Sequence, residues 1–215
     1  MNPPRSNIDL HVHTSRYSPC AETLDPYELG AEMRRKNLHG IVLTEHDHIW
    51  NKEETEELNK AWGDDLIIYR GVEISSEDGH LLIIGIDDLN GIRPRLPAEE
   101  IIARAKQKGA AVVLAHPCYP DPQHCRDVEE ASWAEMLDAL EVASSVTVGE
   151  HETMSRDLAR HKGLLQVAGS DAHALSRVGE TYTAFARLPA DEKELARMIR
   201  EGQGMPARNN LHHAD

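Results

Sequence analysis

The stretch Ile8-Asp9-Leu10-His11-Val12-His13 decides the fold expected for this chain, because it is a short apolar run of β type that ends in paired histidines. Successive side chains of a strand point to opposite faces, so His11 and His13 share a face and can bind one ion. A similar pair, Asp171 and His173, follows the apolar run 164–168. Imidazole and carboxylate together suit Zn²⁺, Mn²⁺ or Fe²⁺ better than Ca²⁺ or Mg²⁺, which favour all-oxygen shells. The two pairs therefore predict a metal-dependent hydrolase.

Apolar runs of β type alternate with helical patterns along most of the chain. Strands are expected at 8–13, 40–44, 66–74, 81–86, 110–115, 140–143 and 164–168, with 181–186 as a candidate eighth strand. Helices are expected at 25–40, where Asp25-Pro26-Tyr27-Glu28 forms an N-terminal signal, and at 52–62, 98–108, 132–137, 150–162 and 191–201. This order predicts an α/β fold with a mostly parallel sheet and enough strands for a barrel.

The length of 215 residues fits a single domain that spans 1–215. A polar tail from about residue 208 is expected to be disordered. The longest irregular piece is expected at 117–127, which is a candidate lid over the site. Within it, Cys118, His124 and Cys125 lack a fourth metal ligand, and ordinary loop residues are the expected interpretation.

The charge of the chain limits its partners. Lys and Arg total 23 against 37 Asp and Glu, a formal net charge of −14, which argues against binding of long nucleic acid but leaves small substrates and short ends open. Three cysteines form no paired framework, and neither a leader nor an apolar run of membrane-spanning length is present. A protein of the reducing cytoplasm without a membrane partner is therefore expected, and its oligomeric state stays open.

Metal-binding residue types recur at the C-terminal ends of the expected strands. His13, Glu45-His46, Glu73, His116 and the pair Asp171/His173 each follow an apolar run directly. In barrels and open α/β sheets, active sites form at this edge. A single histidine such as His80 is more often a hydrogen-bonded core or rim residue, but the recurrence at one topological position makes the whole set a candidate site.

The motifs Asp-Leu-His-Val-His-Thr, Thr-Glu-His-Asp, Gly-Val-Glu, Ala-His-Pro and Gly-Ser-Asp-Ala-His together resemble the polymerase and histidinol phosphatase (PHP) superfamily, over residues 9 to about 183. The resemblance implies a distorted (β/α)7 TIM-like barrel with two or three divalent metal ions (Zn, Mn or Fe) at the C-terminal ends of the strands. It also implies the ligands of each ion: a first held by His11, His13, Glu73 and Asp171, a second held by Glu73 as a bridge together with His80 and His116, and a third held by His46 and His173.

The loop after the first strand departs from the family pattern. Members with three metals usually carry Asp or His in a stretch like Ser-Asp-Gly, whereas this chain has Ser18-Pro19-Cys20. Proline cannot ligate a metal, so either Cys20, Glu45 or Asp47 completes the third site or that site is partly occupied. Strand alternation turns Glu45 and Asp47 away from His46, so both are expected to orient ligands or to cap the following turn. A buried cysteine is the commoner outcome for Cys20.

Two neighbouring cations favour hydrolysis of phosphate esters, because they lower the pKa of a shared water and neutralise phosphate oxygens. The expected activity is a phosphoesterase on a small phosphorylated substrate (a nucleotide, cyclic phosphate or sugar phosphate) through a metal-bridging hydroxide. Glu73 and His173 are the candidate catalytic residues, and Arg16 and Arg177 are the candidates for binding the outer phosphate oxygens.

Two other functions stay open. The first is exonuclease trimming of short DNA or RNA ends, against which the charge and the shortage of aromatic residues for base stacking argue (one Phe, three Trp and five Tyr). The second is a non-catalytic metal-binding domain, which Pro19 alone supports and an intact Glu73 opposes.

Overall fold

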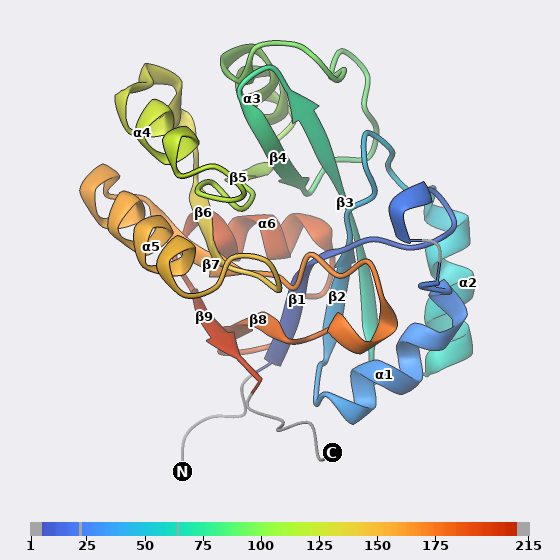
Figure 1. The fold of residues 1–215 in the computed structure, drawn as a ribbon. Coiled ribbons are helices and arrows are strands. Elements are labelled where there is room, and N and C mark those ends of the chain that lie inside the picture. The colour runs from blue at the N-terminus through green and yellow to red at the C-terminus, as the bar shows by residue number, and fades with distance from the viewer. Residues whose placement is uncertain (1–5, 22, 64, 210–215) are drawn as a thin grey trace.

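The computed structural model describes residues 6–21, 23–63 and 65–209, and a curled mixed sheet lies at its centre (Figure 1). The strands run in the order β7-β6-β5-β4-β3-β2-β1-β8-β9. Their bounds are β1 Ser6–Val12, β2 Gly40–Leu43, β3 Ile67–Ser76, β4 Gly79–Ile84, β5 Ala111–Leu114, β6 Ala139–Ala143, β7 Leu165–Ala168, β8 Thr181–Phe185 and β9 Gly204–Arg208. Thr183 of β8 bonds the backbone of Ala168 in β7, with Ala168 N donating to Thr183 Oγ1 at 2.9 Å and Oγ1 donating to Ala168 O at 2.8 Å. The sheet is therefore a nearly closed, barrel-shaped one, which confirms the expected α/β, TIM-like class, although the nine described strands do not match the expected (β/α)7 count.

The prediction of a mostly parallel sheet is wrong for half of the strand pairs. Four pairs are parallel (β1–β2, β2–β3, β5–β6 and β6–β7) and four are antiparallel (β3–β4, β4–β5, β1–β8 and β8–β9). Only Glu77 and Asp78 separate β3 from β4. Such a connection allows a hairpin but not the long crossover that a parallel pair requires.

Helices flank the sheet where the sequence predicts them, with one addition. Their bounds are α1 Leu29–Arg35, α2 Lys52–Trp62, α3 Ala98–Gln107, α4 Pro122–Glu130, α5 Glu150–Lys162 and α6 Glu192–Arg200, together with short 3₁₀ turns at Pro19–Ala21, Pro26–Glu28, Ser132–Met136 and Leu175–Arg177. The expected helix 25–40 begins as a 3₁₀ turn, in which Asp25 Oδ1 accepts a hydrogen bond from Tyr27 N at 2.9 Å. The expected helix 132–137 consists of 3₁₀ structure only.

Two elements were not expected. The segment predicted as an irregular loop contains α4, whose first turn is capped by Asp121 through a 2.8 Å hydrogen bond from Gln123 N. The tail predicted to be disordered from about residue 208 overlaps the end of β9, which pairs with β8 and aligns Arg208 with Thr181. Residues 210–215 lie outside the described part of the chain.

The packing of β1 against the core determines on which face of the sheet its histidines lie. Ile8 and Leu10 of β1 pack in one buried cluster with Leu195, Met198 and Ile199 of α6. By the two-residue period, His11 and His13 point to the opposite face. The apolar side of β1 thus anchors the strand, while His11 and His13, at and just beyond its C-terminal end, lie on the opposite face.

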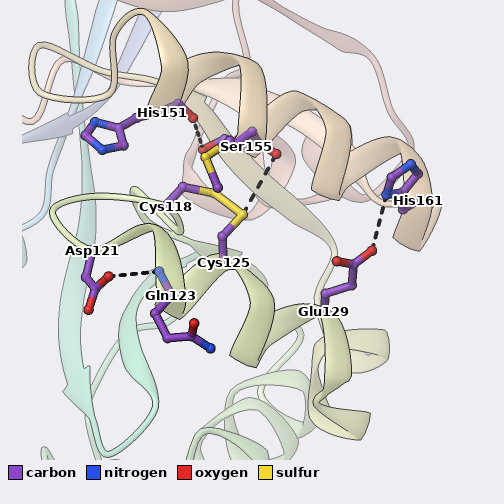
Figure 2. Close-up of a disulfide and its surroundings, with 9 residues drawn as sticks. Cys118, Asp121, Gln123, Cys125, Glu129, His151, Ser155 and His161 are labelled. Atoms are coloured by element: carbon purple, nitrogen blue, oxygen red, sulfur yellow. Dashed lines mark hydrogen bonds and ion pairs between the residues drawn. A yellow bond between two sulfur atoms is a disulfide. The ribbon is translucent and has the colours of Figure 1, made fainter.

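The prediction that the three cysteines form no pair is also wrong. Cys118, in the loop after β5, and Cys125, in α4, are joined by a disulfide (Figure 2). The chain folds back after Cys118, so the start of α4 places the Cα atom of Cys125 4.6 Å from that of Cys118, whereas the sequence pattern predicts a loop here. Cys20 is a free thiol. Among the described helices, none has the length and apolar character needed to cross a membrane.

Candidate metal centre

The four residues assigned to a first metal converge at the end of β1. His11 Nε2 and His13 Nε2 lie 3.0 Å apart. The Oδ1 atom of Asp171 is 3.4 Å from the first and 3.3 Å from the second of these nitrogens. Glu73 Oε1 lies 3.5 Å from His11 Nε2, and its Oε2 lies 3.4 Å from His13 Nε2. Both histidines and Glu73 are fully buried, so the group is shielded from water.

Glu73 also belongs to a second group, with His80 and His116. Its Oε1 atom is 2.9 Å from His80 Nδ1 and 3.2 Å from His116 Nε2. His80 lies in β4, which pairs antiparallel with β3. This β3–β4 hairpin, which the expected parallel sheet did not include, brings His80 to Glu73. The structure thus brings together the residues assigned to a second metal.

A third group contains one residue more than the sequence predicted. His13, His46 and His173 offer ring nitrogens that all lie within 4.8 Å of one another. The ring of His13 stacks against both others, with centroid distances of 4.4 Å to His46 and 4.3 Å to His173. Neither Pro19 nor the exposed Cys20 contributes an atom to this group.

Buried hydrogen bonds fix the loops that carry the ligands. Asp9 accepts bonds from His11 N (3.3 Å), Ser170 N (2.6 Å) and Gly179 N (2.8 Å), so it ties β1 to the loop that holds Asp171. Burial raises the pKa of Asp9 to about 6. A Cβ atom on Gly169 would lie 2.6 Å from His11 Cβ, which is why only glycine allows this approach of the two strands.

Glu45 takes the supporting role expected from strand alternation. It is buried and accepts hydrogen bonds from Thr14 N (3.1 Å), Trp50 Nε1 (2.9 Å) and Ser18 Oγ (2.5 Å). Ser18 Oγ also lies 3.3 Å from His13 Nδ1. Asp47 likewise stabilises a turn, since its Oδ1 accepts a 2.8 Å bond from Ser75 N.

Burial and neighbouring charges shift the pKa values of the buried centre in different directions. Burial opposes ionisation of Glu73, yet the charge of His11 and hydrogen bonds from the surrounding histidines hold the pKa of Glu73 well below its usual range. Burial lowers the pKa of His11, but Glu141, Asp171 and Glu73 together raise it well above the ordinary value. Burial lowers the pKa of His13 to about 4. In the absence of metal, the protonated imidazole of His11 therefore supplies positive charge to the centre. A metal ion would compete with this proton for the same ring nitrogen.

These residues fit a divalent cation. Glu73 Oε2 is buried and has no hydrogen-bond partner of acceptable geometry among the described residues, although His46 Nδ1 is only 2.8 Å away. An unsatisfied buried carboxylate oxygen is costly, and a cation would satisfy it. The donor set of imidazole nitrogens and carboxylate oxygens suits Zn²⁺, Mn²⁺ or Fe²⁺.

The two arginines assigned to phosphate binding each pair with a glutamate. Arg16 Nη2 lies 3.2 Å from Glu54 Oε1, and Arg177 Nη1 lies 3.0 Å from Glu180 Oε2. Both guanidinium groups are about half exposed. Arg16 also lines a cavity of about 110 Å³ between the loop after β1 and α2, together with Pro26, Tyr27, Trp50, Glu54, Glu57 and Leu58. A role in phosphate binding stays a prediction for both arginines.

One buried acidic residue beside the centre was not singled out from the sequence. Glu141 of β6 is fully buried and contacts His11 and His116. The available signal was a charged residue inside the apolar run Leu140-Glu141-Val142.

Comparison with known proteins agrees with this architecture. Residues 149–203 match the model of a PHP-associated family. An uncharacterized protein of Methanocaldococcus jannaschii is 28% identical over 143 residues, which cover 62% of this chain and 79% of that protein.

Two solved structures share the fold. The first is a two-domain protein of Bacteroides vulgatus that contains a predicted PHP-like metal-dependent phosphoesterase, with 18% identity and a TM-score of 0.67 over 97% of this chain and 66% of that chain. The second is the lesion-specific endonuclease EndoQ of Pyrococcus furiosus, with 18% identity and a TM-score of 0.60 over 95% of this chain and 58% of that chain. This chain thus spans less than two thirds of either protein. The family-model match at 149–203 agrees with the resemblance seen in the sequence motifs, and the solved structures show that this chain shares its fold with a PHP-like protein.

Proposed function

We propose that this protein is a metal-dependent phosphoesterase that acts on a small phosphorylated substrate. The observation that carries the proposal is the position of Glu73 between two groups of metal-binding side chains. One carboxylate lies within 3.5 Å of ring nitrogens from His11, His13, His46, His80 and His116. A carboxylate shared in this way is suited to bridge two cations.

The residues of the centre would have distinct roles. His11, His13 and Asp171 would hold one cation and His80 and His116 another, with Glu73 shared between the two. Cations bound there would supply a nucleophilic water of lowered pKa and neutralise phosphate oxygens. The burial of Glu73 excludes bulk water from the middle of the centre and strengthens its electrostatic interactions.

His173 is the candidate proton donor to the leaving group. Its side chain is 33% exposed, so it lies at the rim, where a leaving group would depart. His173 Nδ1 donates to the backbone oxygen of Asp171 at 3.1 Å, which leaves Nε2 as the free ring nitrogen. Nε2 can either hold a proton at the leaving oxygen or join His13 and His46 around a third cation.

Three features favour a small substrate over DNA. The formal charge of −14 repels a phosphate backbone, and the chain has few aromatic residues for base stacking. Both arginines that are candidates for phosphate binding are paired with glutamates.

The fold shared with a lesion-specific endonuclease makes DNA cleavage the second candidate function. The third candidate, a non-catalytic metal-binding domain, is opposed by the complete set of ligands around Glu73.

A hydrolysis screen of protein reconstituted with Mn²⁺ or Zn²⁺ tests the proposal. The substrates would be phosphomonoesters, cyclic phosphates, short oligonucleotides and duplexes with an abasic lesion, each also incubated with Glu73→Gln. Release of phosphate from a small ester by the natural protein alone is expected. Cleavage of DNA without turnover of any small ester would favour the endonuclease function, and inactivity of a fully metal-loaded protein on every substrate would refute both.

A further inference from the structure

Glu141 is a buried carboxylate that belongs to none of the three ligand groups. It lies in the middle of β6, where Leu140, Val142 and Ala143 are buried apolar neighbours. Removing a carboxylate from water costs several kcal/mol unless charged or hydrogen-bonding partners compensate. The partners of Glu141 therefore indicate why a charge is retained at this position.

Both oxygens of Glu141 bond to residues of the metal centre. Oε1 lies 3.0 Å from His11 Nδ1, and Oε2 accepts a 3.1 Å hydrogen bond from the backbone N–H of His116. No lysine or arginine among the described residues forms an ion pair with it, and His11 is its one ion-pair partner there. The carboxylate thus contacts one residue from each of the two groups that share Glu73.

The contact with His11 determines which ring nitrogen is free. A carboxylate accepts but does not donate, so Nδ1 of His11 must carry the proton of this hydrogen bond. Nε2 is then the nitrogen that faces Asp171 at 3.4 Å and Glu73 at 3.5 Å, and in neutral imidazole it carries the free lone pair. A carboxylate behind a histidine ligand fixes the ring orientation and makes the nitrogen more basic toward metal.

The contact with His116 holds an unusual backbone. His116 has a φ of 31°, in the left-handed region that residues other than glycine rarely adopt. Such a conformation persists only where the surroundings stabilise it. The hydrogen bond from the His116 N–H to Glu141 fixes this backbone conformation. It thereby also fixes the position of the His116 ring, whose Nε2 lies 3.2 Å from Glu73 Oε1.

We propose that Glu141 is a positioning residue that orients ligands of both adjacent metal sites, through the ring of His11 and the backbone of His116. The inference rests on the proposed metal centre. It predicts that a change at Glu141 weakens two metals at once, whereas a residue that supports a single ligand would weaken one.

The test is a zinc titration of Glu141→Gln by calorimetry, with the metal content measured after dialysis. Glutamine preserves the volume but removes the negative charge that both N–H donors face, so both bonds weaken, and its NH₂ must in addition replace the acceptor at one of them. Both of the tightest zinc equivalents are expected to weaken by about 10- to 100-fold. Glu32→Gln is the matched control, since Glu32 is a buried glutamate that pairs with Arg35 outside the centre, and it should bind zinc like the natural protein.

Ring-nitrogen NMR of the zinc-loaded proteins adds a readout that a purely structural role would not move. The Nδ1 proton of His11 should show the downfield chemical shift of a hydrogen bond to a carboxylate in the natural protein, and this signal should move upfield in Glu141→Gln. If that variant does not fold, Glu141→Asp keeps the charge but is too short to reach both donors, and it should weaken both equivalents as well.

Three results would overturn the inference. The first is that the variants bind zinc at both sites as tightly as the natural protein. The second is that one zinc equivalent is lost while the affinity for the other is unchanged. The third is that the NMR signal of His11 is the same in the natural protein and in Glu141→Gln. Inactivity toward phosphate esters combined with paired weakening of zinc would instead refute the proposed function and leave the role of Glu141 supported. Absence of zinc binding by the natural protein would refute both.

Discussion

Replacement of Glu73 by glutamine should remove both principal metal sites, because one carboxylate serves them together. The substitution keeps the size of the side chain but deletes a negative charge that lies 2.8–3.5 Å from five imidazole nitrogens. At an effective dielectric constant of about 20, two unit charges 4 Å apart interact by about 4 kcal/mol. That free energy corresponds to a change of about a thousandfold in affinity, and a dication has twice the charge, so a loss of at least this size is expected for each metal.

The assay is competitive titration with a chromophoric chelator, with elemental analysis of the dialysed protein and melting measured on metal-free samples. Glu32→Gln serves as the control for the loss of a buried glutamate. Tight binding of two metals by Glu73→Gln would refute the bridging role, and so would the loss of one metal with the second at its natural affinity.

Three further predictions concern the third site, the pH response and the disulfide. Pro19→Asp adds a carboxylate beside Ser18, whose hydroxyl contacts His13. Metal titration should show that the affinity for the third metal equivalent rises by at least about tenfold, or about 1.4 kcal/mol. An unchanged affinity for the third equivalent would contradict the inference that this site lacks a ligand. The pKa of His11 lies well above 6.5 in the folded, metal-free protein, so its proton stabilises the fold below that pH and this contribution is lost as the pH rises through the folded pKa. The melting temperature of the metal-free protein should therefore fall as the pH rises above 6.5, while its zinc affinity rises. A melting temperature that rises over this range, or a zinc affinity that falls, would refute this linkage. Cys118 and Cys125 close a loop with a sequence separation of 7, for which the lost chain entropy of the unfolded state predicts about 2.5 kcal/mol of stabilisation. Cys125→Ser should lower the free energy of unfolding in urea by about this amount. A count of three free thiols in the denatured, unreduced natural protein would contradict the pairing.

The strand predictions, and the prediction that the candidate ligand residues gather at one site, succeeded where local sequence carries the information. Alternation of apolar residues with histidines in β1 determines both the buried face and the ligand face, and it needs no knowledge of distant contacts. The helix 150–162 was predicted with the bounds that the structure shows. Helix α4 could have been predicted too, because Asp121-Pro122 is the same N-terminal signal as Asp25-Pro26.

Other features depend on contacts that the sequence does not display. Strand β9 contains Pro206 and exposed Met205, so it has no apolar alternation and is defined by pairing with β8. The partners of Glu141 are separated from it by 130 residues (His11) and by 25 residues (His116). The ion pairs of Arg16 with Glu54 and of Arg177 with Glu180 likewise depend on how the loops and helices are placed in space.

The measurement that tests the central claim most directly is anomalous X-ray scattering from crystals loaded with Zn²⁺ or Mn²⁺. Two adjacent metal peaks are predicted, one contacted by His11, His13 and Asp171 and the other by His80 and His116, with the carboxylate of Glu73 in contact with both. A single metal whose ligands exclude Glu73, or metals bound away from these residues, would contradict the account.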